Sequence, residues 1–371
     1  MATDLTATGP HDTANRASAI RTWTANTFPW RTVVLPWIVA RIVVVGTMMV
    51  PYEPHQIHLQ RLILLDGQWF KIIATQWYDG PYARGFPSTF PFFPLYPALA
   101  GGAWRLGAPL WPSMVGLSWL FALIAMAGAH RLARRHLPLA AAPWATWFLV
   151  LAPGAITMVM GYSDALYLAG LVWALVLAED RRWWTAGFVA AIATAARPNG
   201  WIVVVALVVT VATSRAGWRA LGAAVAPSAV LLACWCWYLW SVTGDPLVFY
   251  DAKSAWDEIR IGDLFSDPFS GRHSAALFHF LFAVVGLVFW ALRARRQPPA
   301  WAPIVVLTVL PSLLLGIEGA ARYVILAFPV PFAVADVLTA RGRLAASAGL
   351  AVSGAGLVAL AYLVVYRTWL P

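Results

Sequence analysis

The sequence predicts an all-α polytopic membrane protein, and two observations carry that prediction. Of the 371 residues, 61% are hydrophobic and 11% are charged, whereas soluble domains average about 25% charged residues. The apolar residues gather in about ten to twelve runs of the kind that a spanning helix needs, each roughly 20 residues long, and short polar loops separate them. Because backbone polar groups in lipid must be bonded within the chain, we expect these runs to be helices. A soluble fold is excluded.

The helices are expected wherever the chain stays apolar between polar loops. The predicted spans are 33–50, 92–106, 112–131, 139–158, 164–178, 183–196, 200–213, 220–242, 275–292, 300–316, 323–339 and 344–365. We expect residues 1–32 to form a cytoplasmic N-terminal tail and 33–366 to form one transmembrane domain. That domain includes two long outer loops, 51–91 and 243–273. The first is rich in aromatic residues, which favours short helices along the membrane interface.

The net charge of +10 fits a membrane orientation signal better than nucleic-acid binding. Most carboxylates fall in one set of loops, and most arginines fall in the alternate set, which is the positive-inside pattern. The arginines of that set are Arg131, Arg134, Arg135, Arg181, Arg182, Arg215, Arg219, Arg293, Arg295, Arg296, Arg341 and Arg343. We therefore expect a multi-pass protein of the cell membrane, with no nucleic-acid partner and with its active site on the extracytoplasmic side.

The loop charges disagree with a simple count of spans. Counting from a cytoplasmic N-terminus places Arg131 to Arg135 outside, whereas counting back from Arg181 places them inside. The mismatch falls within 86–131. Three prolines and two adjacent glycines interrupt the run that begins at Phe90, so we expect a re-entrant or broken helix there.

Asp66 is the first candidate for chemistry. It lies in LLDGQWF in the first outer loop, where partial desolvation at the membrane edge would suit a general base. The alternative is a solvated loop residue or a helix cap. Asp79 precedes a glycine, which is typical of a turn.

Three further ionisable residues stand near the predicted outer face. Asp164 opens an apolar run after Ser163, so either residue could cap a helix, or Asp164 could act at the membrane mouth. Arg197 and Arg322 oppose the positive-inside pattern. Because arginine prefers bidentate phosphate or carboxylate partners, they indicate either an anionic lipid headgroup or pairing with Glu318 or Asp164.

Two other groups of ionisable residues have simpler readings. Arg41 lies within the first span, where an ionisable residue is a functional hypothesis by default, but a structural pair with Asp336 is the simpler account. His55 and His58 lie near Glu53, yet this pattern lacks a metal-binding motif or a second ligand cluster. We expect no metal and no other cofactor.

The order of these motifs resembles the PIG-V-like branch of the GT-C glycosyltransferases, membrane mannosyltransferases that use a lipid-phosphate sugar donor. The matching segments, in family order over about residues 30–335, are LLDGQWF, FFPLYP (Phe92–Pro97), GYSDALY, ARPNG, GDPLVFYDAKSAWD and RYVILAFP. Two positions depart from the family pattern. Leu65 replaces a common tryptophan, and Asp164 replaces the more usual glutamate, which shortens the reach of the carboxylate.

The resemblance implies a GT-C-like helical bundle that moves a sugar, mannose by family, from a polyprenyl-phosphate donor to an acceptor hydroxyl with inversion. The acceptor would be a glycolipid, a glycan or a protein in cell-envelope biosynthesis. The roles implied are catalytic for Asp66 and Asp164, donor-phosphate binding for Arg197, Arg322 and Lys253, and substrate binding for Trp69, Trp77, Asp79, Tyr82, Tyr162 and Asn199. A transporter or flippase for a polyprenyl-linked sugar or lipid is the alternative, and a scaffold subunit is a third.

Overall fold

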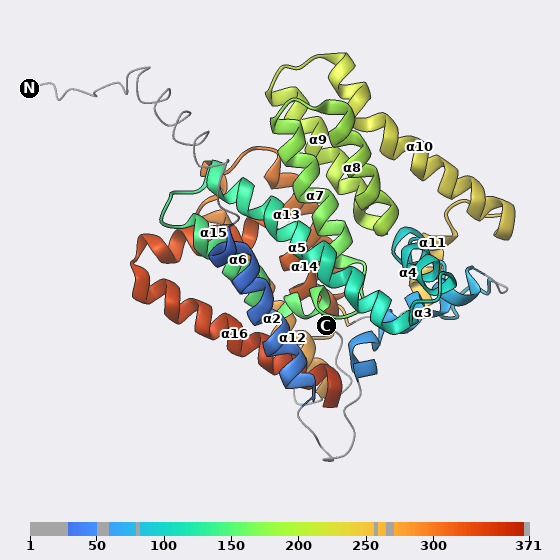
Figure 1. Cartoon of the computed structure of the whole chain (residues 1–371), viewed down its shortest axis with the longest axis horizontal. Coiled ribbons are helices and arrows are strands. Elements are labelled where there is room, and N and C mark those ends of the chain that lie inside the picture. The colour runs from blue at the N-terminus through green and yellow to red at the C-terminus, as the bar shows by residue number, and fades with distance from the viewer. Residues whose placement is uncertain (1–28, 50–58, 79–81, 256–258, 265–270, 367–371) are drawn as a thin grey trace, which may run out of the picture.

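The computed structural model describes residues 29–49, 59–78, 82–255, 259–264 and 271–366. Every regular element in these residues is a helix, which confirms the all-α fold class (Figure 1). The α-helices are α2 (Leu35–Met49), α3 (Asp66–Gln76), α4 (Leu95–Arg105), α5 (Leu110–His136), α6 (Ala142–Leu151), α7 (Asp164–Glu179), α8 (Trp183–Ala196), α9 (Trp201–Thr213), α10 (Trp218–Thr243), α11 (Val248–Asp251), α12 (Gly271–Ala291), α13 (Trp301–Leu315), α14 (Ala320–Leu326), α15 (Pro329–Ala340) and α16 (Arg343–Tyr366). Short 3₁₀ or π turns join them: η1 (Trp30–Val34), η2 (Leu59–Ile63), η3 (Pro153–Met158), η4 (Pro198–Gly200), η5 (Ala252–Ala255), η6 (Ala294–Arg296) and η7 (Ile317–Gly319).

Each predicted span contains a helix, but the helices differ in length. Among the described residues, five are long and apolar enough to cross a membrane, namely Trp30–Met49, α5, α10, His273–Ala291 and Arg343–Val365. The pair Ile317–Leu326 and Pro329–Ala340, bent by 72°, would be a sixth. The apolar helices α6, α8, α9 and α13 are shorter. Among the described residues, the remaining predicted spans hold helices of 10 to 16 residues.

Helix α4 fits the interruption that is expected in the run from Phe90. Its 11 residues rise about 16 Å at 1.5 Å per residue, which is short of a hydrocarbon core of about 30 Å. A Cβ on Gly101 would lie 2.4 Å from the carbonyl oxygen of Ala74, so α4 packs closely on the end of α3. The run does not form a complete crossing, as the prolines predicted.

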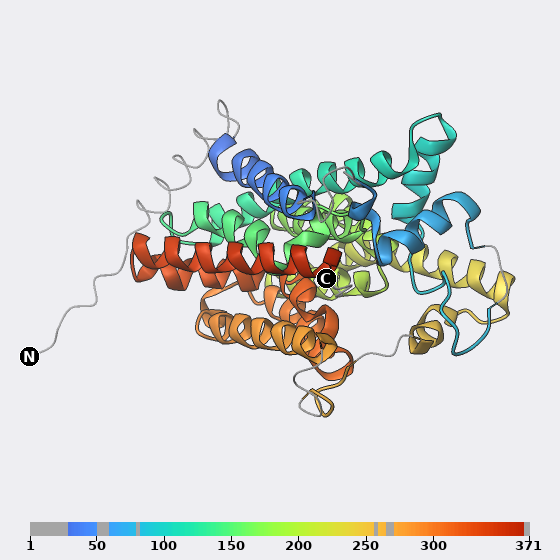
Figure 2. The ribbon, with the colours of Figure 1, turned by 90° about the horizontal axis from the view of Figure 1, so that it is seen from below.

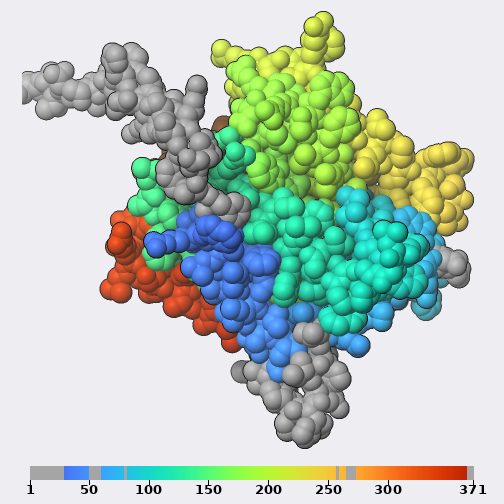
Figure 3. Space-filling view, viewed as in Figure 1, coloured from blue at the N-terminus to red at the C-terminus, as the bar shows by residue number. Residues whose placement is uncertain are grey.

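Small residues allow the central helices to approach one another closely. A Cβ on Gly170 of α7 would lie 2.8 Å from Cβ of Ala193 on α8, and one on Gly187 of α8 would lie 2.2 Å from the carbonyl oxygen of Ala223 on α10. Such small-residue contacts are typical of helix packing in membranes. Figures 2 and 3 both show α16 on one flank of the molecule and α10 on the other.

The two ends of α7 carry different charged groups. At its C-terminal end, Arg135 of α5 pairs with Glu179 at 3.0 Å and with Asp180 at 2.7 Å, and His136 lies 2.8 Å from Glu179. Asp164 begins the helix at the other end. A 16-residue helix separates these ends by about 24 Å, so the arginine-rich loops and the candidate site lie at opposite ends of the bundle.

The predicted pair between Arg41 and Asp336 is wrong. Arg41 donates to the carbonyl oxygens of Trp37 at 3.1 Å and Met158 at 3.0 Å, while Asp336 pairs with Arg293 at 2.8 Å. Two nitrogens of the Arg41 guanidinium donate to carbonyl groups of α2 itself and of η3, and the carboxylate of Asp336 pairs with another arginine.

Candidate active site

Four charged side chains from four distant segments meet at one end of the bundle. Asp66 is the first residue of α3, Asp164 is the first residue of α7, Arg197 directly follows α8, and Arg322 lies in α14. We call these four residues the charge cluster. Two carboxylates and two guanidinium groups give it a formal charge of zero.

Arg322 joins the two carboxylates. Its Nε and Nη2 donate to the two carboxylate oxygens of Asp164, both at 2.7 Å, and its Nη1 donates to Oδ2 of Asp66 at 2.6 Å. Such forked, charge-assisted contacts are the strongest that arginine makes. Arg197 adds a second cation, with Nη1 at 2.7 Å from Oδ1 of Asp164. Of the two pairing partners considered for these arginines, Asp164 is the one that both contact.

The two carboxylates differ in accessibility. The side chain of Asp164 is 0% exposed, whereas that of Asp66 is 27% exposed. Asp164 is therefore enclosed by its arginine partners, and Ser163 makes no capping hydrogen bond. Asp66 is the carboxylate that an external molecule can reach.

The start of α3 is fixed by the loop that precedes α7. The Gly161 amide donates to the carbonyl oxygen of Leu62 at 2.7 Å, and the Tyr162 hydroxyl donates to that of Leu64 at 3.0 Å. Leu65 adopts φ 56°, a conformation that costs free energy for a residue with a side chain. These contacts bring Asp66 to Arg322 although the two are 256 residues apart in the chain.

Arg322 is held on both sides. Its guanidinium lies 5.0 Å from the centre of the Tyr162 ring. The preceding residue, Ala321, donates its amide to Nδ1 of His279 at 3.3 Å. A Cβ on Gly154 would lie 2.1 Å from the Ala321 carbonyl oxygen, so only glycine permits this approach.

The Arg197 turn is equally tight. Arg197 Nε donates to Oδ1 of Asn199 at 3.3 Å, and a Cβ on Gly200 would lie 2.3 Å from Cα of Thr194. The Nδ2 atom of Asn199 is buried and has no hydrogen-bond partner within the described part of the chain. That free donor lies beside an arginine, where an anionic ligand would accept from it.

The other predicted aromatic site residues contact neighbouring aromatic rings. Trp69 stacks on Phe92 at 5.9 Å, Trp77 contacts Tyr78 at 5.2 Å, and Tyr82 contacts Phe90 at 5.8 Å between ring centres. The contact of Trp69 with Phe92 packs α3 against the FFPLYP segment. Lys253 is exposed on η5, and Asp79 lies outside the described residues.

No group of three or more metal-ligating side chains is found in the residues that the structure describes. His55, His58 and Glu53, for which the sequence predicts no metal, fall outside those residues. The sequence also left several contributors unnoticed. The ring centre of Tyr323, which lies in RYVILAFP beside Arg322, is 5.9 Å from the Arg197 guanidinium. His279 lies in no motif, and only its contact with Ala321 identifies it.

Comparison with known proteins gave matches among solved structures alone. No protein-family model matches the chain, and no curated protein matches it significantly. Archaeal oligosaccharyltransferase AglB from Archaeoglobus fulgidus, in complex with an inhibitory peptide and a dolichol-phosphate, aligns with a TM-score of 0.48 and 13% identity over 91% of this chain and 56% of that chain. The apo form of the Archaeoglobus fulgidus oligosaccharyltransferase aligns with a TM-score of 0.48 and 14% identity over 91% of this chain and 54% of that chain. The complex of that enzyme with Zn and sulfate aligns with a TM-score of 0.47 and 15% identity over 88% of this chain and 53% of that chain. The present chain thus spans about half the length of these structures.

Proposed function

We propose that this protein is a membrane glycosyltransferase that moves a sugar from a polyprenyl-phosphate donor to an acceptor hydroxyl. One observation supports this most directly: an accessible carboxylate and two buried arginines meet in one cluster at one end of an apolar helical bundle. Such a transferase needs a base for the acceptor and cations for the lipid phosphate. The residues of the cluster also lie in the segments that resemble the GT-C glycosyltransferases.

In this mechanism Asp66 is the general base. Its carboxylate takes the proton of the acceptor hydroxyl, and the acceptor oxygen attacks the anomeric carbon from the face opposite the phosphate. The bond between that carbon and the phosphate oxygen breaks, so the configuration inverts and polyprenyl phosphate leaves. Arg322 Nη1 lies 2.6 Å from Oδ2 of Asp66, so the base and a cation for the donor phosphate stand next to each other.

The arginines stabilise the charge that develops on the leaving phosphate. Arg322 presents Nη1 toward the exposed side of the cluster, where it now contacts Asp66. A donor phosphate would accept from this nitrogen and from Nδ2 of Asn199, and Asp66 would then be released toward the acceptor. Fixed donors aimed at developing charge contribute strongly to catalysis.

Asp164 has a different part in this proposal. Because it is enclosed by Arg197 and Arg322, it cannot contact the acceptor, and we assign it as a positioning residue. Its two oxygens hold Nε and Nη2 of Arg322, so that Nη1 is directed at Asp66. The shorter side chain, Asp in place of the family's usual Glu, suits this contact.

The finer assignments follow the family resemblance. Mannose is the proposed sugar, and the proposed acceptor is a glycolipid, glycan or protein at the extracytoplasmic face. The second candidate is a transporter or flippase for a polyprenyl-linked sugar or lipid. It would use the arginines in the same way but would form no new glycosidic bond, and it would not need Asp66 as a base.

Comparing wild type with Asp66→Asn tests the proposal. Membranes that contain either protein receive labelled polyprenyl-phosphate-mannose and an extract of host lipids and glycans. We expect a labelled product from wild type alone, with equal expression and folding of both. A product from Asp66→Asn at the wild-type rate would remove Asp66 as the base. Movement of the donor across the membrane without any product would favour the transporter.

A further inference from the structure

Two loops at the end of the bundle opposite the charge cluster carry four exposed arginines. Arg181 and Arg182 lie between α7 and α8, Arg215 lies between α9 and α10, and Arg219 lies in the first turn of α10. We call these four residues the arginine patch. None of them forms an ion pair with a carboxylate among the residues that the structure describes.

Close packing of α8 on α10 brings the two loops together. A Cβ on Gly187 of α8 would lie 2.2 Å from the carbonyl oxygen of Ala223 and 3.1 Å from that of Ala224, both on α10. All three residues lie within about two turns of the start of their helices. The two helices therefore begin side by side, and the arginines that stand at their starts gather on one surface.

The carboxylates that precede the arginine patch in the chain are already paired. Glu179 and Asp180 come directly before Arg181. Arg135 of α5 pairs with Glu179 at 3.0 Å and with Asp180 at 2.7 Å, and His136 lies 2.8 Å from Glu179. These carboxylates are therefore engaged by α5, and the positive charges of the arginine patch stay available to an external anion.

Two of these arginines occupy backbone positions that favour glycine. Arg181 has φ 57° and Arg215 has φ 51°. The Arg181 amide donates to the carbonyl oxygen of Ala178 at 2.9 Å, and the Arg215 amide donates to that of Ala212 at 3.2 Å. In each loop the next amide donates to the carbonyl oxygen five residues before it, at 2.9 Å and 3.2 Å. This is the Schellman turn, in which glycine is the usual left-handed residue because a side chain there costs free energy. Arginine at both equivalent positions indicates a use for the guanidinium groups outside the fold.

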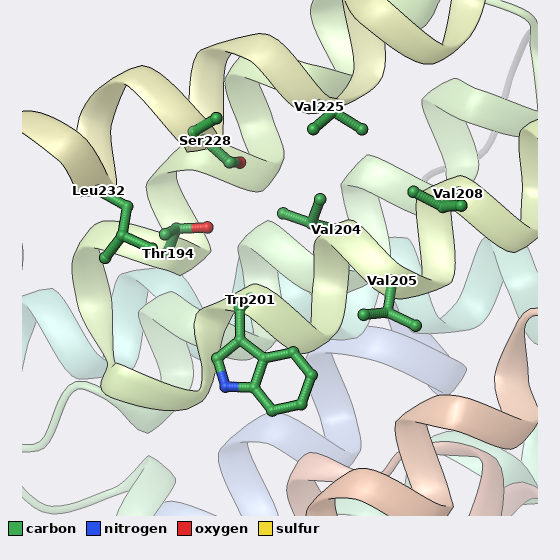
Figure 4. A pocket seen from close by; sticks show the side chains of 9 residues that line it. Thr194, Trp201, Val204, Val205, Val208, Val225, Ser228 and Leu232 are labelled. Atoms are coloured by element: carbon green, nitrogen blue, oxygen red, sulfur yellow. The ribbon is translucent and has the colours of Figure 1, made fainter. Parts of the chain in front are cut away.

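Exposed aromatic and apolar side chains border the arginine patch. Trp184 is 60% exposed and Trp218 is 77% exposed, and the Arg219 guanidinium lies 5.4 Å from the centre of the Trp218 ring. Figure 4 shows Val208 of α9 and Val225 of α10 farther along these helices, where they line an apolar groove at the surface. Tryptophan beside arginine, at the end of an apolar helix surface, is typical of the headgroup region of a membrane. These neighbours favour an anion that belongs to the membrane over one in solution.

We propose that the arginine patch binds the headgroup phosphate of an anionic phospholipid in the leaflet at this end of the bundle. Arginine donates to phosphate oxygens in a bidentate manner, and basic surfaces between membrane helices hold anionic headgroups in this way. The lipid phosphate supplies a negative charge that the chain does not place beside these arginines. The inference concerns the end opposite the charge cluster, so it does not depend on the proposed reaction.

Lipid binding to the purified protein in a neutral detergent tests the proposal. Fluorescent phosphatidylglycerol is titrated into wild type, into Arg181→Gln/Arg215→Gln and into Arg341→Gln/Arg343→Gln. The last variant is the matched control, because it removes two exposed arginines where α15 meets α16. We expect Kd to rise by about tenfold or more for the first variant and to change little for the control. An equal rise in both variants would mean that only overall charge matters, and it would overturn the proposal.

Competition identifies the source of the phosphate. Unlabelled phosphatidylglycerol, phosphatidylcholine, glycerol phosphate and a mixture of transfer RNAs are each added to wild type that holds the fluorescent lipid. We expect displacement by phosphatidylglycerol alone. Equal displacement by glycerol phosphate would show a site for a free anion, and equal displacement by RNA would show a nucleic-acid surface. Either result would overturn the proposal.

The left-handed arginines provide a measurement with the opposite sign. Arg181→Gly/Arg215→Gly removes the same charges as the glutamine variant and relieves both backbone positions. In detergent without phosphatidylglycerol, we expect its melting temperature to rise by about 1–2 °C, while its Kd for phosphatidylglycerol rises as in the glutamine variant. A lower melting temperature would show that the two arginines serve the fold itself, and it would overturn the proposal.

Discussion

Asp66 and Asp164 contact the same arginine but stand in different surroundings. Asp66 has more than a quarter of its side chain exposed and makes one contact with Arg322. Asp164 is fully enclosed and compensates the charges of two arginines. The same chemical group can therefore act as a base in one position and as a structural anion in the other.

Substituting each carboxylate by its amide should separate these roles. Removing one partner of a buried ion pair costs about 3–5 kcal/mol, because it leaves a buried charge uncompensated. We expect Asp164→Asn to lose both stability and turnover. Asp66→Asn should lose turnover but change stability by less than about 1 kcal/mol, because an accessible pair contributes little. Thermal unfolding followed by tryptophan fluorescence in detergent, together with product formation, measures both. Wild-type stability of Asp164→Asn would contradict its positioning role.

The sequence identified all four members of the charge cluster but not their connections. Asp66, Asp164, Arg197 and Arg322 stood out because charged residues are rare in this chain and because two of them oppose the positive-inside pattern. Which charges meet depends on helix packing, so the choice between Glu318 and Asp164 stayed open and the pair of Arg41 with Asp336 was wrong. The strained backbone at Leu65 could not be predicted, since leucine does not favour positive φ.

The Arg197–Gly200 turn joins α8 to α9 and fixes the position of the Arg197 guanidinium. Gly200 has a negative φ, so its role is space rather than backbone freedom. A side chain there would meet backbone atoms of Ala193 and Thr194 at 2.5 Å and 2.3 Å. Backbone cannot move aside as a flexible side chain can, so α8 and α9 would have to separate.

Gly200→Ala should therefore weaken both the fold and the site. Overpacking of this kind costs typically about 1–3 kcal/mol, and moving the turn would shift Arg197 away from Asp164. Gly222→Ala in α10 is the control, because no heavy atom lies within 4 Å of its added Cβ and alanine is favoured over glycine in a helix by about 1 kcal/mol. Melting temperature and turnover should fall for Gly200→Ala only. Equal melting temperatures would show that the turn can relax.

The sequence predicted which segments form helices, but it did not predict how long each helix is. The prolines before and within 92–106 predicted an interrupted segment, and α4 is short. In contrast, the predicted run 139–158 is divided into α6 and the 3₁₀ turn η3, although its hydropathy is continuous. Gly154 in that turn makes the close approach to Ala321, so the break in the run helps to position Arg322.

Paired charged side chains gather at both ends of the helical bundle. The pairs of Arg135 with Glu179 and Asp180 tie α5 to α7 at one end, and the charge cluster joins α3, α7, α8 and α14 at the other. An arginine-rich loop directly follows α7 at the first of these two ends. By the positive-inside rule, we predict that this end faces the cytoplasm and that the charge cluster faces the opposite side.

Cysteine accessibility tests this orientation. Phe86, in the loop before α4, and Leu139, in the loop after α5, are 68% and 71% exposed. After Cys234 and Cys236 are replaced by alanine, Phe86→Cys or Leu139→Cys is introduced in cells. We expect a membrane-impermeant maleimide to label Phe86→Cys in intact cells and Leu139→Cys only after permeabilisation. The reverse labelling would place the charge cluster on the cytoplasmic side, and the acceptor would then have to be a cytoplasmic molecule. Labelling of both in intact cells would mean that α5 does not separate the two loops.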